Sequence, residues 1–110
     1  MADVAPKPRV KLPETAAAGE IIEVKALITH VMETGNRHDA DGKPIPRNII
    51  HTFKAAFAGA PIFEAELGTG IAANPYLSFF MRVPVPGELV LTWIDDQGVT
   101  TVERTPLNVV

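Results

Sequence analysis

The sequence contains no cysteine among its 110 residues. This absence excludes a disulfide framework, a thiol nucleophile and a cysteine-ligated zinc site. Serine is almost as scarce, because Ser78 is the only one, and its neighbours form no nucleophile elbow and include no base. We therefore predict that the chain is not an enzyme, and we assign it no catalytic residue and no cofactor.

The sequence also lacks a basic excess and a long apolar run. Ten lysine and arginine residues are mixed with thirteen aspartate and glutamate residues, which gives a formal net charge of −3. A nucleic-acid surface would need clustered basic charge, and a membrane-spanning helix would need about 20 consecutive apolar residues. The first residues contain no apolar signal-peptide core, so the sequence alone favours the cytoplasm.

Strand periodicity is the dominant pattern in this chain. Alternating apolar residues predict strands at residues 9–12, 21–30, 48–58, 62–67, 76–83, 88–94 and 99–110. No segment has helical periodicity, and residues 1–8 are short, polar and proline-containing. We predict a flexible lead-in at 1–8 and one all-β domain at 9–110, an immunoglobulin-like antiparallel β-sandwich of about seven strands, with an open barrel as the alternative.

The alternation also predicts which side chains face the core. In residues 21–30 the even-numbered positions form the apolar face, and Leu27 is the apolar exception on the opposite face. In residues 48–58 the odd-numbered positions, His51 among them, form the inward set. Trp93 is most simply a core residue packed between the sheets.

A long connection, residues 31–47, joins two of the predicted strands. Connections in compact domains are usually ~4–6 residues long, and much longer ones tend to bind partners or to be disordered. We predict that this loop contacts other proteins, or that some of its polar side chains instead pin it to the domain, Arg47 above all. The predicted contact residues are Met32, Glu33, Asn36, Arg37, Asp39 and Arg47.

A second predicted contact surface is apolar. Phe79 and Phe80 are consecutive in a strand, so their rings must lie on opposite faces of the sheet. One ring belongs to the core, and the other is exposed unless a loop or a partner covers it. Leu27, Tyr76 and Phe80 are the predicted members of this patch, which is either covered locally or forms a subunit interface.

The remaining polar groups suggest no catalytic site. His30, His38 and His51 lie on separate predicted elements and no two have the spacing of metal ligands, so we assign no metal site. Asp95 and Asp96 are neighbours in a predicted hairpin turn that ends at Gly98, where aspartate is ordinary turn chemistry.

Four blocks of sequence together resemble the SoxZ family. They are residues 30–35 (HVMETG), 43–50 (KPIPRNII), 73–79 (ANPYLSF) and 92–98 (TWIDDQG), and they follow the order and spacing of that family. The similarity extends from about residue 8 to the end. Val31 is a departure, because the family usually has proline after the histidine.

The resemblance implies a non-catalytic immunoglobulin-like subunit. SoxZ-like proteins pair with a SoxY-type subunit to form the carrier of covalently bound sulfur intermediates in bacterial thiosulfate oxidation, which docks transiently on the pathway enzymes. The sulfur is carried on a cysteine of the SoxY-type partner, and this chain has none. The resemblance further implies a periplasmic location without a signal peptide of its own, through export together with the partner.

Two other functions remain open from the sequence. One is a metal-dependent enzyme acting on sulfur compounds through the histidines. The other is a free-standing homodimeric binding sandwich.

Overall fold

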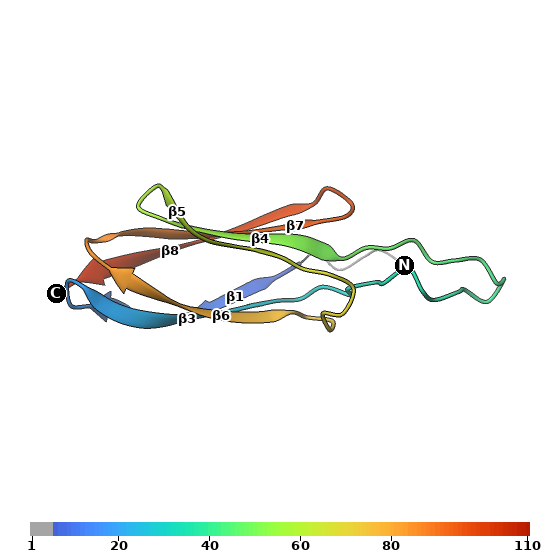
Figure 1. The fold of residues 1–110 in the computed structure, drawn as a ribbon, viewed down its shortest axis with the longest axis horizontal. Helices are drawn as coiled ribbons and strands as arrows, with labels where there is room; N and C mark the ends of the chain where they lie inside the picture. Colours follow the sequence, from blue (N-terminus) through green and yellow to red (C-terminus); the bar gives the residue numbers. More distant parts are fainter. Residues whose placement is uncertain (1–5) are drawn as a thin grey trace.

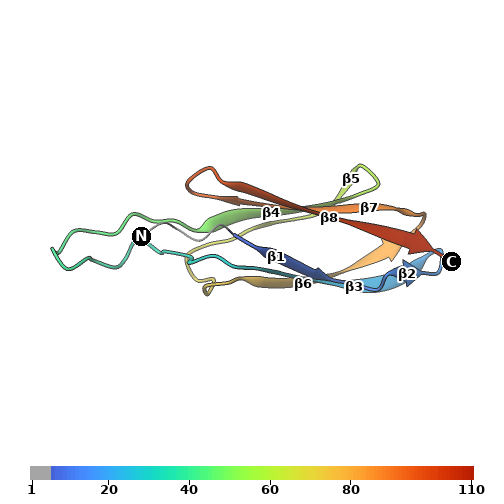
Figure 2. The same cartoon turned by 180° about the vertical axis from the view of Figure 1, so that it is seen from behind.

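The computed structural model describes residues 6–110, which form two β-sheets packed face to face (Figures 1 and 2). The smaller sheet has the order β1-β3-β6, and the larger has the order β2-β8-β7-β4-β5. All paired strands are antiparallel except β2 and β8. The predicted all-β, immunoglobulin-like sandwich is confirmed. The strands are β1 Pro8–Lys11, β2 Thr15–Ala16, β3 Glu20–Ile28, β4 Ile50–Phe57, β5 Ala60–Glu66, β6 Tyr76–Val83, β7 Gly87–Asp95 and β8 Thr100–Val109.

An aromatic cluster joins the two sheets. Trp93 from β7 and Phe53 from β4 have ring centroids 5.2 Å apart, and Phe79 from β6 lies 6.2 Å from Phe53. All three side chains are buried, which confirms the prediction for Trp93. Phe63 of β5 stacks on Phe79 with ring centroids 5.0 Å apart. Because buried aromatic rings contribute both apolar area and favourable ring contacts, this cluster is the centre of the core.

One predicted core face is wrong at β4. His51 was expected to point inward together with Ile49, but Ile49 and Ile50 are both buried and His51 is only half-buried. The pairing of β4 with β7 shifts register between Ile50 and Thr52. A β-bulge places an extra residue in one strand and so breaks the period of two. The imidazole Nδ1 of His51 instead lies 2.7 Å from the Thr52 hydroxyl.

Three residues of the predicted lead-in, residues 6–8, are described by the structure. Residues 1–5 lie outside the described part of the chain. Lys7 exchanges hydrogen bonds with Thr29, whose hydroxyl accepts from the Lys7 N–H at 2.8 Å, and Pro8 begins β1. The described residues form no helix that is long and apolar enough to cross a membrane.

The segment at residues 31–49, which we call the arm, projects beyond one end of the sandwich (Figure 1, green; seen from behind in Figure 2). The molecule measures 59 × 23 × 19 Å, and its radius of gyration is 16.3 Å. A compact domain of this length would have a radius of gyration of about 13 Å. The fold therefore presents the arm as a separate projection.

Candidate functional site

The arm is a hydrogen-bonded hairpin. Near the sandwich, Glu33 and Asn48 exchange two backbone hydrogen bonds of 2.8 Å. Further out, the Ile45 N–H donates to the Arg37 carbonyl at 2.9 Å. These bonds satisfy backbone groups that an irregular loop would leave to water. The arm therefore has a defined shape in the isolated chain.

Asp39 shapes the tip of the arm. Its Oδ1 accepts the backbone N–H groups of Asp41 at 2.9 Å and Lys43 at 3.0 Å. Its own backbone N–H donates to the Lys43 carbonyl at 2.9 Å, and Gly42 has the positive φ of 78° that closes the turn. Asp39 was predicted as a contact residue, and the structure gives it this turn-forming role.

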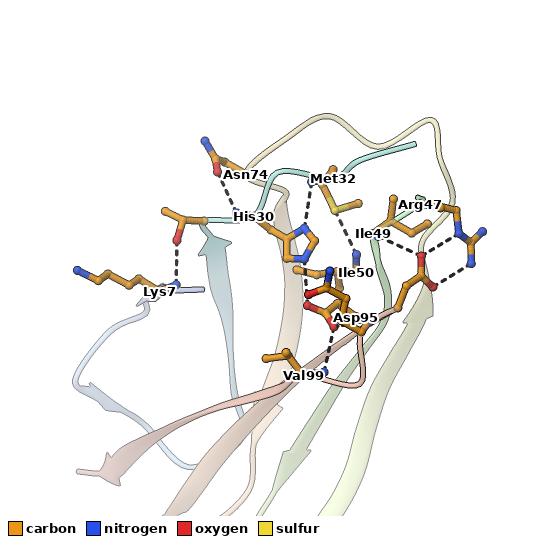
Figure 3. A network of polar contacts seen from close by, with 12 residues as sticks. Lys7, His30, Met32, Arg47, Ile49, Ile50, Asn74, Asp95 and Val99 are labelled. Carbon is orange, nitrogen blue, oxygen red and sulfur yellow. Dashed lines mark hydrogen bonds and ion pairs between the residues drawn. The ribbon is translucent and has the colours of Figure 1, made fainter. Parts of the chain in front are cut away.

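The base of the arm is fixed by a buried histidine and a buried aspartate (Figure 3). The Met32 N–H donates to Nδ1 of His30 at 3.0 Å. That nitrogen must therefore carry a lone pair, so the ring proton lies on Nε2, which donates to Oδ2 of Asp95 at 3.1 Å. The side chains are only 4% and 5% exposed. The pair joins the end of β3 to the end of β7.

Met32 is the residue that this pair positions. Its φ is 50°, a left-handed conformation that is uncommon for residues other than glycine. Its sulfur accepts the Ile50 N–H at 3.3 Å, and its side chain is only 5% exposed (Figure 3). Met32 was predicted as a contact residue, and the structure places its side chain in the core beneath the arm.

Asp95 has two functions, of which the sequence indicated one. Its Oδ1 accepts the N–H groups of Gln97 at 2.9 Å and Val99 at 3.0 Å, as the predicted turn requires. Its Oδ2 binds His30, which is 65 residues away in the chain. The sequence did not predict this contact, because no local pattern links His30 to Asp95.

A second connection ties the outer side of the arm to the sandwich. The guanidinium of Arg47 donates to both carboxylate oxygens of Asp96, at 2.8 and 2.9 Å, and the Ile49 N–H donates to Oδ2 at 3.1 Å (Figure 3). Burial alone would raise the pKa of Asp96, but the hydrogen bonds from Arg47 and Ile49 outweigh it and lower that pKa below 3.8. Arg47 therefore pins the arm.

Glu33 and Arg37 form an ion pair along the arm. The Arg37 Nε lies 3.2 and 3.1 Å from the two carboxylate oxygens of Glu33. The hydrogen bond from Arg37 lowers the pKa of Glu33 below 4.5. The Arg37 side chain remains mostly exposed, and Asn36 beside it is exposed as well. Asn36 and Arg37 are therefore predicted loop residues whose side chains are open to a partner.

A cavity of about 550 Å³ lies at the base of the arm, between the two strands of the hairpin and Gln97. It is open to solvent, and its lining combines apolar groups such as Ile45 with the polar side chains of Glu33 and Arg37. The side-chain oxygen of Asn48 is buried here and has no hydrogen-bond partner among the described residues.

The outer face of the smaller sheet carries the predicted apolar patch. Leu27 and Tyr76 lie directly opposite each other on β3 and β6, and Phe80 lies opposite Glu23. Phe80 is 70% exposed and Tyr76 56% exposed, whereas Phe79 is buried. Among the described residues, no loop covers Phe80, so local cover is excluded for that part of the chain. We call Leu27, Tyr76 and Phe80 the β6 patch.

The three histidines lie apart. His30 is buried at the base of the arm, His38 is exposed near the tip, and His51 lies on β4. Within residues 6–110, no three histidine, aspartate or glutamate side chains are grouped in a way that could hold a metal ion.

Solved structures share this fold at low sequence identity. A superoxide reductase (neelaredoxin) from Ignicoccus hospitalis is 15% identical, with a TM-score of 0.71 over 94% of this chain and 80% of that one. The sulfur carrier protein SoxY from Chlorobium limicola f thiosulfatophilum is 14% identical, with a TM-score of 0.64 over 93% of this chain and 74% of that one. Because an enzyme and a carrier protein share the architecture, the fold does not decide the function.

The sequence itself gives the family. No curated protein matches the chain. Residues 10–106 match the family of the sulphur oxidation protein SoxZ, and this range contains the arm, nearly all of both sheets, and the His30–Asp95 pair at the base of the arm. The chain therefore belongs to the SoxZ family.

Proposed function

We propose that this chain is a non-catalytic scaffold subunit that pairs with a SoxY-type subunit, which carries the sulfur intermediates of bacterial thiosulfate oxidation. The observation that carries this proposal is the exposed β6 patch in a chain of the SoxZ family. Large apolar side chains that a small domain leaves exposed on one sheet face favour an association surface there, because exposing them to water is unfavourable. The polypeptide has no cysteine, so the sulfur must be carried on the other subunit.

The arm has the features of a transient docking element. It projects beyond the sandwich, and it presents Arg37, Asn36 and Lys43 on its exposed surface. Exposed polar and charged groups influence the rate and selectivity of encounter more than the lifetime of a complex. A carrier that must bind and leave several enzymes in turn requires contacts of this kind, and we assign the docking on the pathway enzymes to the arm.

The pairing is tested by Phe80→Asp, with Ile62→Asp as the matched control. Phe80 is 70% exposed on β6, and Ile62 is 41% exposed on β5 in the opposite sheet. Light scattering of the chain mixed with its SoxY-type partner measures the fraction of one-to-one heterodimer. We expect Phe80→Asp to weaken pairing at least about tenfold, or about 1.4 kcal/mol, and Ile62→Asp to leave it unchanged. Unchanged pairing in Phe80→Asp would contradict the assigned face.

The proposed location is the periplasm, reached by export together with the SoxY-type partner. Cell fractionation with and without the partner gene tests it. We expect the chain in the periplasmic fraction only when the partner is present. Periplasmic chain in cells that lack the partner would refute export in complex.

A further inference from the structure

The two sheets have four edges, and three of them are protected against pairing with another strand. β1 is four residues long and includes Pro8, Arg9 and Lys11. β2 has only two residues, and the part of β8 that it leaves unpaired, residues 100–107, contains Glu103, Arg104 and Pro106. β5 contains Pro61, and its pairing with β4 is interrupted by an irregularity at Ala55/Ala56. Short length, proline, charge and bulges are the usual means by which proteins keep sheet edges from adding strands.

β6 has the fewest of these protections. It pairs with β3 in one unbroken register from Tyr76 to Val83, it contains no proline, and its one charged residue, Arg82, lies next to its end. Its sequence, YLSFFMRV, is rich in aromatic and other residues that favour strands. Within the described residues, β6 is the end strand of the smaller sheet and pairs with no strand other than β3.

The hydrogen-bonding direction along β6 follows from one bond beside it. The Ile28 N–H donates to the Pro75 carbonyl at 3.2 Å. Continuing the β3–β6 register by one pair beyond Leu27 and Tyr76 places these two residues opposite each other. In an antiparallel pair of strands, hydrogen-bonded residue pairs alternate with pairs that are not hydrogen-bonded. Every second residue of β6 therefore points its N–H and C=O towards β3. The others point to the free edge, and none has a backbone partner within residues 6–110. These outward-facing residues are Tyr76, Ser78, Phe80 and Arg82.

We propose that the free edge of β6 accepts an extended strand of the SoxY-type partner, so that the smaller sheet continues into the other subunit. This inference rests on the proposed function and specifies how the pairing takes place. Only an extended strand matches a row of alternating N–H and C=O groups. Tyr76 and Phe80 are two of the residues whose backbone groups face the free edge, and their side chains lie on the outer face of the sheet. These side chains would contact the added strand on that face.

The shared fold favours this partner as the occupant. The sulfur carrier protein SoxY from Chlorobium limicola f thiosulfatophilum has the same fold over 93% of this chain, so a subunit of that kind has a strand equivalent to β6. Two equivalent edges related by an approximate two-fold axis meet in the antiparallel direction, which is the arrangement of isologous interfaces.

Amide hydrogen exchange of the heterodimer tests the inference directly. In the free chain we expect the amides of Ser78 and Phe80 to exchange fast and those of Leu77 and Phe79 to be protected by their pairing with β3. On complex formation we expect exchange at Ser78 and Phe80 to slow at least about tenfold. Glu64 on β5 also faces a free edge and should not change. A heterodimer without new protection at Ser78 and Phe80 refutes the edge pairing and leaves the proposed function intact, whereas no heterodimer refutes both.

A proline variant provides a second test. Ser78→Pro removes an N–H that faces the free edge, so it breaks no hydrogen bond with β3. Glu64→Pro is the matched control, because the Leu67 N–H bond to the His51 carbonyl and the β4–β5 register direct the Glu64 N–H outward as well. We expect Ser78→Pro to raise the Kd for the partner at least about tenfold and Glu64→Pro to leave it unchanged, with equal Tm values.

Two outcomes of these experiments overturn the inference. One is an unchanged Kd in a folded Ser78→Pro variant. The other is concentration-dependent protection of Ser78 and Phe80 in the isolated chain, because the strand at the edge would then come from a second copy of this chain.

Discussion

The sandwich and the arm belong to one chain but are stabilised by different interactions. In the sandwich, alternating apolar side chains meet between two sheets, with Trp93 and Phe53 at the centre. In the arm, residues 31–49, order comes from backbone hydrogen bonds and from carboxylates that bind backbone N–H groups, as at Asp39. The junction combines both, because the polar pair of His30 and Asp95 is buried against the end of the core.

The difference shows how a small domain supports a projection. Apolar burial requires an interior, and a two-stranded hairpin has none. Polar contacts can define its shape, but each contributes only ~0.5–1.5 kcal/mol in net terms because water competes for the same groups. The arm is therefore expected to open locally at a lower free energy than the sandwich unfolds.

The largest effect is expected in the sandwich. Trp93→Ala removes a buried aromatic side chain between the sheets and should lower the free energy of unfolding by about 3–5 kcal/mol. Chemical denaturation measures this loss. Phe80→Ala is the control, because its ring is exposed, and it should change the stability by less than about 0.5 kcal/mol. Equal losses in the two variants would contradict the assigned core.

A smaller effect is expected at the junction. His30→Ala leaves the Met32 N–H and one oxygen of Asp95 without their buried partner, and should lower the free energy of unfolding by about 2–3 kcal/mol. Hydrogen exchange should also accelerate at Met32 and Glu33. His38→Ala, on the exposed part of the arm, serves as the control and should change neither quantity. Wild-type exchange in His30→Ala would refute the role of this pair.

The smallest effect is expected on the outer side of the arm, and it depends on pH. The pKa of Asp96 is lowered in the folded state, so its stabilising contribution is fully present above 3.8, the ordinary value, and is lost as the pH falls through the lowered value. Glu33 behaves in the same way relative to 4.5. Amide chemical shifts at Ile49, followed from pH 7 to pH 2, should stay constant until the carboxylates protonate.

The variant Asp96→Asn distinguishes the titration of Asp96 from that of Glu33. It keeps an acceptor for Ile49 but loses the charge that pairs with Arg47, so the acid transition at Ile49 should disappear, at a cost of about 1 kcal/mol at neutral pH. Asp41→Asn is the control, because Asp41 accepts no hydrogen bond that ties the arm to the sandwich. An Ile49 transition that persists in Asp96→Asn would assign it to another group.

Much of the sandwich could be predicted from the sequence. The strand at residues 76–83 was placed without error, and the other six predicted strands were placed within one or two residues of those observed. Leu27 and Phe80 were correctly placed on the outer face, because the period of two is a local property of an extended chain. His51 was placed wrongly, since a bulge is set by the partner strand and not by the sequence pattern.

The candidate site was predicted less completely. Arg47 was correctly singled out as a residue that pins the loop, and its position beside the strand was the signal. The burial of Met32 was missed, because it lies in a polar, turn-rich segment. The contacts of His30 with Asp95 and of Arg47 with Asp96 connect residues 65 and 49 positions apart, and no periodicity links them.

The sequence by itself determined the all-β architecture, the inward and outward faces of most strands, and the absence of any cysteine that could carry sulfur. The tertiary structure alone decided that the arm is a hydrogen-bonded hairpin, that a buried histidine and aspartate hold its base, and that β6 is the least protected edge strand. The physical reason is that alternation and composition act locally along the chain, whereas edges, bulges and buried polar pairs exist only after distant strands have packed together.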